Sequence, residues 1–100
     1  MNNSEDKRIV HFNDMECIII KKKYANGRIH LALVDTKDGM QVANVTLNIE
    51  TVPVIDDMII VKDYRENKGV YSALLAAGII KPCDRKIPIG FEYGLICFLN

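Results

Sequence analysis

The chain has 100 residues, of which 49% are hydrophobic and 26% are charged. These proportions are typical of a globular domain and argue against an intrinsically disordered chain. Thirteen Lys and Arg residues balance thirteen Asp and Glu residues, whereas proteins that coat nucleic acid carry a basic excess, so general nucleic-acid binding is disfavoured. The length predicts a single domain over residues 1–100.

Hydropathy and cysteine content predict a cytoplasmic location. No apolar run approaches the length of a membrane span, and the polar start MNNSEDKRIV has no apolar segment typical of a signal peptide. The cysteines Cys17, Cys83 and Cys97 are odd in number and widely spaced. This arrangement favours free thiols in a reducing compartment over a disulfide framework.

The first part of the chain predicts strands joined by a tight turn. RIVHF, residues 8–12, reads as a first strand. Asn26-Gly27 is the preferred two-residue hairpin turn, because both turn residues need positive φ. With this loop Tyr24 pairs with Ile29, and alternation gives the hairpin a core face. That face carries Ile18, Ile20, Tyr24, Ile29, Leu31 and Leu33, with Lys22 at its outer end.

The opposite face of this predicted hairpin gathers a cationic patch. It consists of Lys21, Lys23, Arg28 and His30. The patch could bind a phosphate, a nucleotide or an acidic protein surface. The alternative, which we favour, is a solvated hairpin tip, because lysines also protect sheet edges from aggregation.

A second hairpin and a connector follow. Residues 35–39 form the predicted loop, with Gly39 where a bulged turn requires glycine. QVANVTLNIE, residues 41–50, alternates in the manner of a strand. Residues 50–57 predict a connector because Pro53 cannot donate a ladder hydrogen bond and an acidic pair follows it. MIIVK, residues 58–62, predicts a buried central strand.

The segment from Lys68 to Ala77 is the one that predicts a helix. Gly78 stands where a left-handed helix stop is expected. The polar residues before the helix have the types and spacing of helix caps. We therefore interpret them as a strand-to-helix turn rather than as a catalytic cluster. They are Asp63, Glu66 and Asn67.

After Lys68 the predicted helix contains no charged residue. A core stripe is formed by Val70, Tyr71, Leu74, Leu75 and Ala77, and the opposite face by Ser72, Ala73 and Ala76. A helix that is apolar or small all round is usually covered. The cover could be residues 81–94, a second copy or a partner, although short Ala-rich faces also occur in water. We expect a homodimer with Ser72, Ala73 and Ala76 at its interface.

The segment KPCDRKIPIGFEYG, residues 81–94, predicts a long loop because it holds two prolines and two glycines. Long loops in compact domains tend to carry function. A structured crossover that covers the helix is the alternative. EYGLICFLN, residues 92–100, predicts the last strand. The candidate partner- or anion-binding residues of the loop are Arg85, Lys86, Phe91 and Tyr93.

These elements together predict an α+β fold. We expect an antiparallel sheet of about five or six strands with one α-helix packed on a face.

Signatures of catalysis and of metal binding are weak. His11, His30 and the cysteines lack metal-ligand spacing, so no metal is expected. Cys83 lies among cations that could lower its pKa, but neither histidine can be placed beside it. The chain has no G-x-G-x-x-G, P-loop, H-E-x-x-H or G-x-S-x-G motif. Helix capping and a solvated connector explain the carboxylates Asp56, Asp57, Asp63 and Glu66 with fewer assumptions than an acid–base pair.

The chain after Arg28 contains a distinctive set of segments, VKDYRENKGVYSALLAAGIIKP and the closing IPIGFEYGLICFL. In these segments it resembles a family of short bacterial, phage and plasmid proteins that is classed as a domain of unknown function. Lys68 departs from the acidic residue expected there. The matching positions are Lys62, Asp63, Tyr64, Glu66, Asn67, Gly69, Leu74, Ala77, Gly78, Ile79, Pro88 and Gly90.

The resemblance implies a mobile-element accessory protein without assigned catalytic residues. By analogy, such proteins are often counter-defence factors. We therefore expect a non-enzymatic, cofactor-free protein that inhibits a host immune protein, in the manner of an anti-CRISPR, by binding its surface. The first alternative is a sponge for a phosphate-containing nucleotide signal, held by the cationic patch with Tyr24, Phe91 and Tyr93. The second is a small enzyme that uses Asp63 or Cys83.

Overall fold

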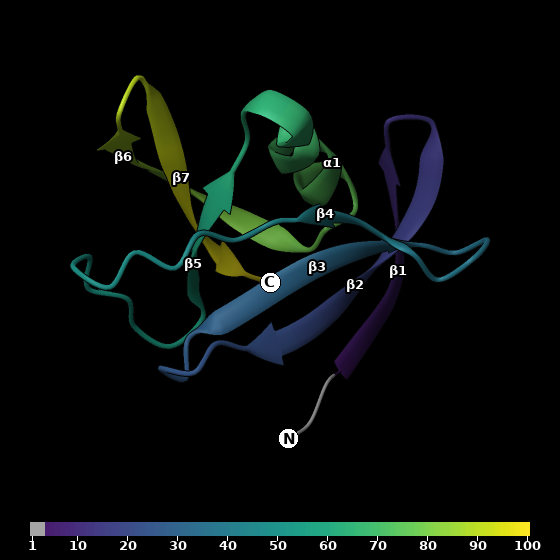
Figure 1. The fold of residues 1–100 in the computed structure, drawn as a ribbon, viewed down its shortest axis with the longest axis horizontal. Coiled ribbons are helices and arrows are strands. Elements are labelled where there is room, and N and C mark those ends of the chain that lie inside the picture. The colour runs from purple at the N-terminus through teal and green to yellow at the C-terminus, as the bar shows by residue number, and fades with distance from the viewer. Residues whose placement is uncertain (1–3) are drawn as a thin grey trace.

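A computed structural model describes the backbone of residues 4–100 and the side chains of residues 7–100. It confirms the α+β class, with seven antiparallel strands in the described chain rather than five or six (Figure 1). The first sheet has the order β1 (Ser4–Phe12), β2 (Met15–Lys23), β3 (Ile29–Asp35) and β4 (Gln41–Asn44). The second has the order β5 (Met58–Lys62), β7 (Glu92–Leu99) and β6 (Ile80–Ile89). A 3-10 turn, η1 (Arg65–Asn67), and the helix α1 (Val70–Ala76) lie between β5 and β6.

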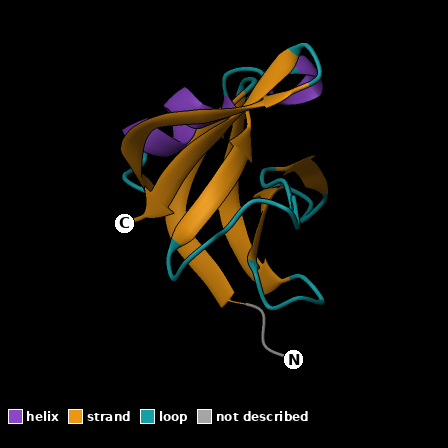
Figure 2. Ribbon diagram, turned by 90° about the vertical axis from the view of Figure 1, so that its left-hand side faces the viewer, coloured by secondary structure: helices purple, strands orange, loops and turns teal. Residues whose placement is uncertain are grey.

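Residues 45–47 join the two sheets. The Val45 N–H donates to the Leu31 carbonyl at 2.9 Å, whereas the Val45 carbonyl accepts from the Lys62 N–H at 2.8 Å. The Leu47 N–H then donates to the Ile60 carbonyl at 2.8 Å. The chain thus passes from the edge of β3 to the edge of β5, and the strands curve around a common interior (Figure 2). Residues 58–62, predicted as a buried central strand, form β5, which is buried but stands at the end of the order β5–β7–β6, where residues 45–47 pair with its outer edge.

Two clusters of apolar side chains fill the fold. The main core lies between the two sheets and α1, and includes Val10, Ile19, Leu31, Leu33, Ile59, Val61, Val70, Leu74, Ile79 and Cys97. The smaller cluster lies on the other face of the second sheet, where Met58, Ile60 and Ile96 pack against the connector through Leu47, Ile49, Val52 and Val54. The connector of residues 50–57 contains no strand, as predicted.

The register of the β2–β3 hairpin differs from the predicted one by a single residue. Lys23, not Tyr24, lies opposite Ile29. The Tyr24 N–H donates to the Arg28 carbonyl and the Gly27 N–H to the Tyr24 carbonyl, so the loop has three residues, with Gly27 at φ 85°. This is the geometry of a type I turn followed by a glycine bulge. A slip of one residue exchanges the two faces of a strand. The core face of β2 and β3 therefore carries Cys17, Ile19, Leu31 and Leu33, while Ile18 and Ile20 are half-buried on the other side.

The prediction of a long loop before the last strand is wrong for most of that segment, because the segment forms β6 and the turn into β7. Ile89 lies opposite Glu92, which leaves Gly90 and Phe91 as a two-residue turn. Pro82 and Pro88 are tolerated because β6 is the edge of its sheet and is bulged between Pro82 and Arg85. The other predicted hairpin is confirmed, with Gly39 at φ 72° in its loop, but its second strand, predicted over residues 41–50, is shorter and ends as β4 at Asn44. The last strand is confirmed as β7.

The helix ends as predicted. Gly78 has φ 74°, and the N–H groups of Gly78 and Ile79 donate to the carbonyls of Leu75 and Leu74, which is a Schellman motif. The core stripe is only partly as expected, because Leu75 is 37% exposed whereas Val70 and Leu74 are buried. In the described chain no helix is long and apolar enough to cross a membrane.

Candidate functional site

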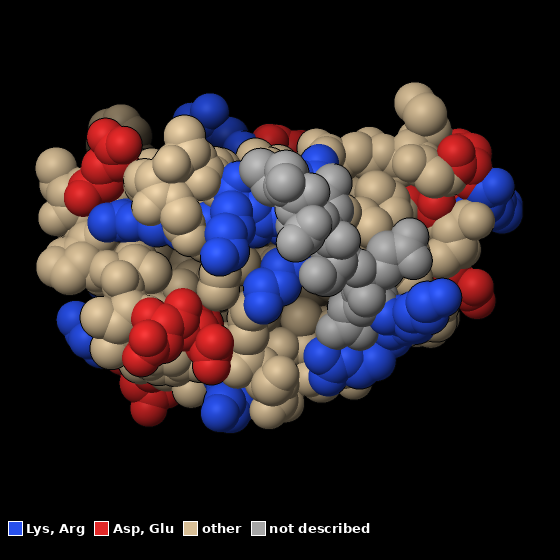
Figure 3. Space-filling view, turned by 90° about the horizontal axis from the view of Figure 1, so that it is seen from below, with Lys and Arg blue, Asp and Glu red and all other residues tan. Residues whose placement is uncertain are grey.

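A pocket of about 520 Å³ opens between the first sheet and the ends of β6 and β7. Five segments of the described chain meet there: part of β1, the β2–β3 hairpin, the turn before β5, the stretch from the end of α1 into β6, and the end of β7 with Asn100. Figure 3 shows Lys and Arg side chains gathered across the middle of one face. The residues that line the pocket are Lys7, Arg8, Ile19, Lys21, Leu31, Asp57, Ile79, Lys81, Leu99 and Asn100.

The apolar lining of the pocket is part of the main core. Ile19, Leu31 and Ile79 are each at most 2% exposed, so their positions are fixed by the packing of both sheets. Leu99, at the end of β7, is half-buried and packs against the same cluster. Side chains held in a close-packed core have little freedom to move. These buried side chains therefore form a rigid floor beneath the pocket, and Leu99 is the apolar lining residue that is more than marginally exposed among those the structure describes.

Four cationic side chains surround this apolar surface. Lys7, Lys21 and Lys81 are exposed, and within residues 7–100 none of them forms an ion pair. Arg8 is also exposed, and its guanidinium donates to the Gly78 carbonyl at 2.5 Å. Lys21 lies opposite Leu31 and on the same face as Ile19, which is why it reaches the pocket. The concentration of positive charge suits a phosphate or carboxylate group.

Among the residues whose side chains the structure describes, one carboxylate and one side-chain amide also line the pocket. Asp57 follows Asp56, which has φ 44°, in a turn closed by the Met58 N–H and the Ile55 carbonyl at 2.9 Å. The Asp57 carbonyl also accepts from the Leu99 N–H at 2.9 Å. The Asn100 side-chain amide donates to the Gly78 carbonyl at 3.1 Å. Asp57 and Asn100 are thereby anchored through the backbone or the helix end rather than left on a loose loop.

The predicted cationic patch is divided by the observed register. Lys21 and Lys23 lie on the core-side face of the hairpin, and only Lys21 lines the pocket. Arg28 and His30 lie on the other face, where both have structural partners. Arg28 donates to the Ile49 carbonyl at 2.7 Å and the Glu50 carbonyl at 3.3 Å, which ties the hairpin to the connector.

His30 is half-buried and has two partners within the fold. Its ring stacks on Tyr24 with centroids 4.4 Å apart, and its Nε2 lies 2.6 Å from the Asn44 Oδ1. The Tyr24 hydroxyl lies 2.9 Å from the Thr46 Oγ1. The grouping of Arg28 and His30 with Lys21 was therefore wrong. Sequence reasoning also missed Lys7, Arg8 and Lys81, since no local pattern reveals that the ends of the two sheets meet.

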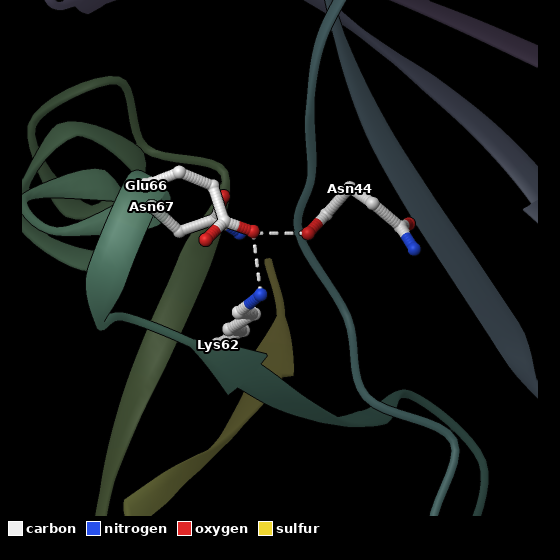
Figure 4. Close-up of polar contacts among 4 residues, drawn as sticks. All are labelled: Asn44, Lys62, Glu66 and Asn67. Carbon is white, nitrogen blue, oxygen red and sulfur yellow. Dashed lines mark hydrogen bonds and ion pairs between the residues drawn. The ribbon is translucent and has the colours of Figure 1, made fainter. Parts of the chain in front are cut away.

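The polar cluster before the helix has a structural arrangement. The Asp63 Oδ1 accepts from the Gly69 N–H at 3.1 Å and from the Tyr71 N–H at 2.9 Å, so its assignment as a helix cap is confirmed. Glu66 and Asn67 do not cap α1, because η1 intervenes and Gly69, at φ 96°, takes the N-cap position. Glu66 instead pairs with the Lys62 Nζ at 2.5 Å, and this hydrogen bond lowers the pKa of the Glu66 carboxyl. The Asn67 Nδ2 donates to the Asn44 carbonyl at 2.7 Å (Figure 4).

The β6–β7 tip presents aromatic and basic groups together. Phe91 is fully exposed in the turn, and the Lys86 Nζ lies 4.3 Å from the centre of the half-exposed Tyr93 ring. Arg85 lines a smaller hollow of about 370 Å³ beside the connector. The expected interface residues of α1 differ among themselves: Ser72 and Ala76 are exposed, whereas Ala73 is half-buried against the core.

The three thiols are free, and two of them are buried. Burial, with a smaller contribution from Cys83, raises the pKa of the Cys97 thiol to about 12. Burial also raises the pKa of Cys17, with the Asp35 charge adding to it. Among the described residues no three His, Cys, Asp or Glu side chains are arranged to hold a metal ion.

Comparison with protein-family models, with curated proteins and with solved structures gives no significant match. The family resemblance drawn from the sequence therefore stays a prediction, and the candidate site rests on its own geometry.

Proposed function

We propose that the protein is a non-enzymatic binding protein that holds a small phosphate-bearing ligand in the pocket between its sheets. The observation that carries this proposal is the combination of Lys7, Arg8, Lys21 and Lys81 with an apolar lining taken from the core. Cationic donors provide affinity for the phosphate, and the half-buried Leu99 offers a limited apolar contact beside them.

Size and charge both favour a small ligand over a macromolecule. A volume of about 520 Å³ falls within the range of roughly 300–1,000 Å³ that small-molecule pockets occupy. The chain as a whole has no net charge, so a positive potential can arise only from a local excess of cations such as the one at this pocket. A nucleic-acid-binding surface would extend along a face to follow a phosphate backbone.

This proposal corresponds to the nucleotide-sponge expectation, with a different set of residues. In a mobile-element setting the ligand would be a phosphate-containing host signal, and binding would remove it from solution. Such a protein needs no catalytic group, and Asp63 is already occupied as a helix cap.

The proposal is tested by calorimetric titration of adenosine monophosphate and inorganic phosphate into the wild type, Lys21→Glu and Lys68→Glu. Lys21 lines the pocket, whereas Lys68 is an exposed lysine outside it, which makes Lys68→Glu a matched charge control. We expect binding by the wild type and Lys68→Glu, loss in Lys21→Glu, and weaker binding at high salt. Absence of wild-type binding, or equal affinity in all three proteins, would contradict the proposal.

The second candidate is the inhibitor of a host immune protein that the sequence led us to expect first. The specific observation in its favour is Phe91, whose side chain is fully exposed at the tip of a hairpin beside the Lys86–Tyr93 pair. Aromatic residues are enriched at protein interfaces, and Tyr is among the residues that contribute most to binding. Purified host defence proteins that bind the wild type but not Phe91→Ser would support it, and equal binding of both would count against this tip as the contact.

A further inference from the structure

We infer that two copies of the chain associate through their β6–β7 hairpins, with Phe91 of each copy seated in the smaller hollow of the other. This contact is separate from the proposed phosphate pocket, because neither Phe91 nor its neighbour Glu92 lines that pocket. Two features of the same hairpin point to it: a fully exposed aromatic side chain, and a partly apolar hollow that this side chain does not occupy.

Phe91 is presented to solvent by a tight turn. Its side chain is fully exposed, and the two-residue turn that holds it is closed by the pair Ile89 and Glu92 at the outer end of the second sheet (Figure 1). Burying a side chain of this kind removes roughly 150–250 Å² of surface from water. Single exposed apolar residues are common on protein surfaces, so a partner is indicated only because the same hairpin also carries a matching hollow.

The hollow, of about 370 Å³, lies between β6 and the connector. Met58 and Ile96 are buried and form its floor, whereas Ile55 is 64% exposed and Ile87 is half-buried, so both keep surface for a further contact. A cavity of about 150 Å³ with an aliphatic lining holds a benzene ring, and the hollow therefore has room for a Phe side chain. The described residues that line it are Thr51, Val52, Pro53, Ile55, Met58, Arg85, Lys86, Ile87 and Ile96.

Charge favours a second copy as the occupant. Arg85 and Lys86 make one side of the hollow cationic. Lys86 already lies over the Tyr93 ring, whereas Arg85 forms no ion pair within residues 7–100. The hollow thus suits an aromatic side chain that is followed by an acidic one. The chain supplies that combination at its own tip, where Phe91 precedes Glu92, and Glu92 also has no ion pair within the same range. Opposite charges across an interface favour the correct pairing and fix its register.

The positions of the tip and the hollow allow the contact to form twice in one dimer. Arg85 precedes Phe91 by six residues, a distance of about 20 Å in an extended strand, so Phe91 does not reach the hollow of its own copy. A two-fold axis midway between them, with the two hairpins antiparallel, places each tip over the hollow of the other copy. Both copies then use the same surface, as in most homodimers. Contacts this small are typical of weak, transient association.

The test is sedimentation equilibrium at protein concentrations from about 10 μM to about 1 mM, which covers the dissociation constants of weak complexes. The proteins are the wild type, Phe91→Ser, Arg85→Glu, Glu92→Lys and the control Ala76→Glu. The control places a charge on the exposed face of α1, the dimer interface that the sequence predicted. All four positions are exposed or half-buried, and circular dichroism verifies that each variant is folded.

A mixture of the two charge variants makes the test specific for a second copy. In Arg85→Glu alone and in Glu92→Lys alone, every tip meets a hollow that carries the same charge. When the two variants are mixed in equal amounts, the acidic tip of one meets the cationic hollow of the other, and the cationic tip meets the acidic hollow. Charge complementarity is thereby restored at both contacts of a mixed dimer.

We expect a concentration-dependent dimer for the wild type and Ala76→Glu. The dissociation constant should rise at least about tenfold in Phe91→Ser and in each charge variant alone, as for the loss of an interface anchor, and the mixture should recover the dimer. A wild type that stays monomeric, as it would if the tip served a different protein, would overturn the inference. So would a dimer unaffected by Phe91→Ser, a dimer lost in Ala76→Glu, or a mixture no more associated than its components. Phosphate titration of the same variants decides the proposed function separately.

Discussion

The Asn67 side chain ties the entrance of the helix to the end of β4: its Nδ2 donates a hydrogen bond of 2.7 Å to the Asn44 carbonyl. Asn67 is 1% exposed and lies in η1, so this bond links the segment after β5 to the first sheet. Polar side chains are buried at a cost unless they are paired. The bond is therefore a long-range contact that holds η1 against the first sheet.

Replacing Asn67 should destabilise the protein. Asn67→Ala leaves the Asn44 carbonyl without this donor and opens a small void, and we expect a loss of about 1–3 kcal/mol in the free energy of unfolding. Urea denaturation followed by circular dichroism measures the change. Glu66→Gln, at the exposed neighbouring position, is the control and should differ little from the wild type. Equal stability of Asn67→Ala and the control would show that the bond contributes nothing.

Gly94 is required for the packing of the smaller cluster. A Cβ at this position would lie 2.6 Å from the Ile60 Cγ2 and 3.0 Å from the Ile89 Cδ1. The nearer atom belongs to a β-branched side chain that is 1% exposed and cannot move aside easily. Overpacking of this kind costs about 1–3 kcal/mol, so Gly94→Ala should lower the denaturation midpoint.

The origin of that cost can be isolated with Ile60→Ala, which removes the obstructing methyl group. The double variant should be less destabilised than the sum of the two single variants, because the clash is absent from it. Simple additivity of the two changes would place the cost of Gly94→Ala elsewhere, for example in the backbone of β7.

The two hydrogen bonds accepted by Asp63 predict different results for two substitutions. Asp63→Ala removes the acceptor for the Gly69 and Tyr71 N–H groups and should cost about 0.5–2 kcal/mol, the usual range for a lost helix cap. Asp63→Asn keeps an oxygen in the same place and should cost much less, since Asn and Asp are comparable caps. Thermal denaturation of both variants distinguishes a cap from a residue whose charge itself is needed.

Stability should fall at alkaline pH because of Cys97. Its pKa is raised from 9.0 to about 12 by burial, so between these values the folded protein retains a proton that the unfolded chain has released. The contribution of the protonated Cys97 thiol to the free energy of unfolding is complete below pH 9 and is lost as pH rises towards 12. Its slope is at most about 1.4 kcal/mol per pH unit for one group. Urea denaturation as a function of pH, repeated with Cys97→Ala, should give a shallower slope in the variant; identical slopes would mean that other groups cause the decline.

Local signals predicted some elements well. Gly78 after an apolar helix gives a left-handed stop by itself, because the conformation depends on the missing Cβ and not on distant contacts. The same holds for Gly39 in its bulged loop. Asp63 was recognised as a cap because its side-chain chemistry acts within a few residues.

Other features depended on choices that the sequence leaves open. Asn26-Gly27 is compatible with a two-residue or a three-residue loop, and the difference of one residue decided whether Ile18 or Ile19 faces the core. Pro82 and Pro88 are typical of loops, but they are also tolerated at the edge of a sheet, and which strand becomes an edge is decided by tertiary pairing.

The pocket was the least predictable feature. Lys7, Lys21 and Lys81 lie in three different strands, and only the closure of the two sheets brings them together. Lys21 was predicted as a candidate because it was expected to share a face with Arg28 and His30, and the observed register separates it from both. The sequence alone offered nothing to distinguish Lys21, in the pocket, from Lys23, two residues away.

The segment of residues 45–47, which pairs with β3 through Leu31 and with β5 through Ile60 and Lys62, has a consequence for the way the protein unfolds. Breaking it would separate two halves that each expose one side of the main core, so neither half is a foldon that can persist alone. Amide protons in β3 and in β5 should therefore exchange with solvent through the same global opening, and the domain should respond to heat, denaturant or protease as one cooperative unit.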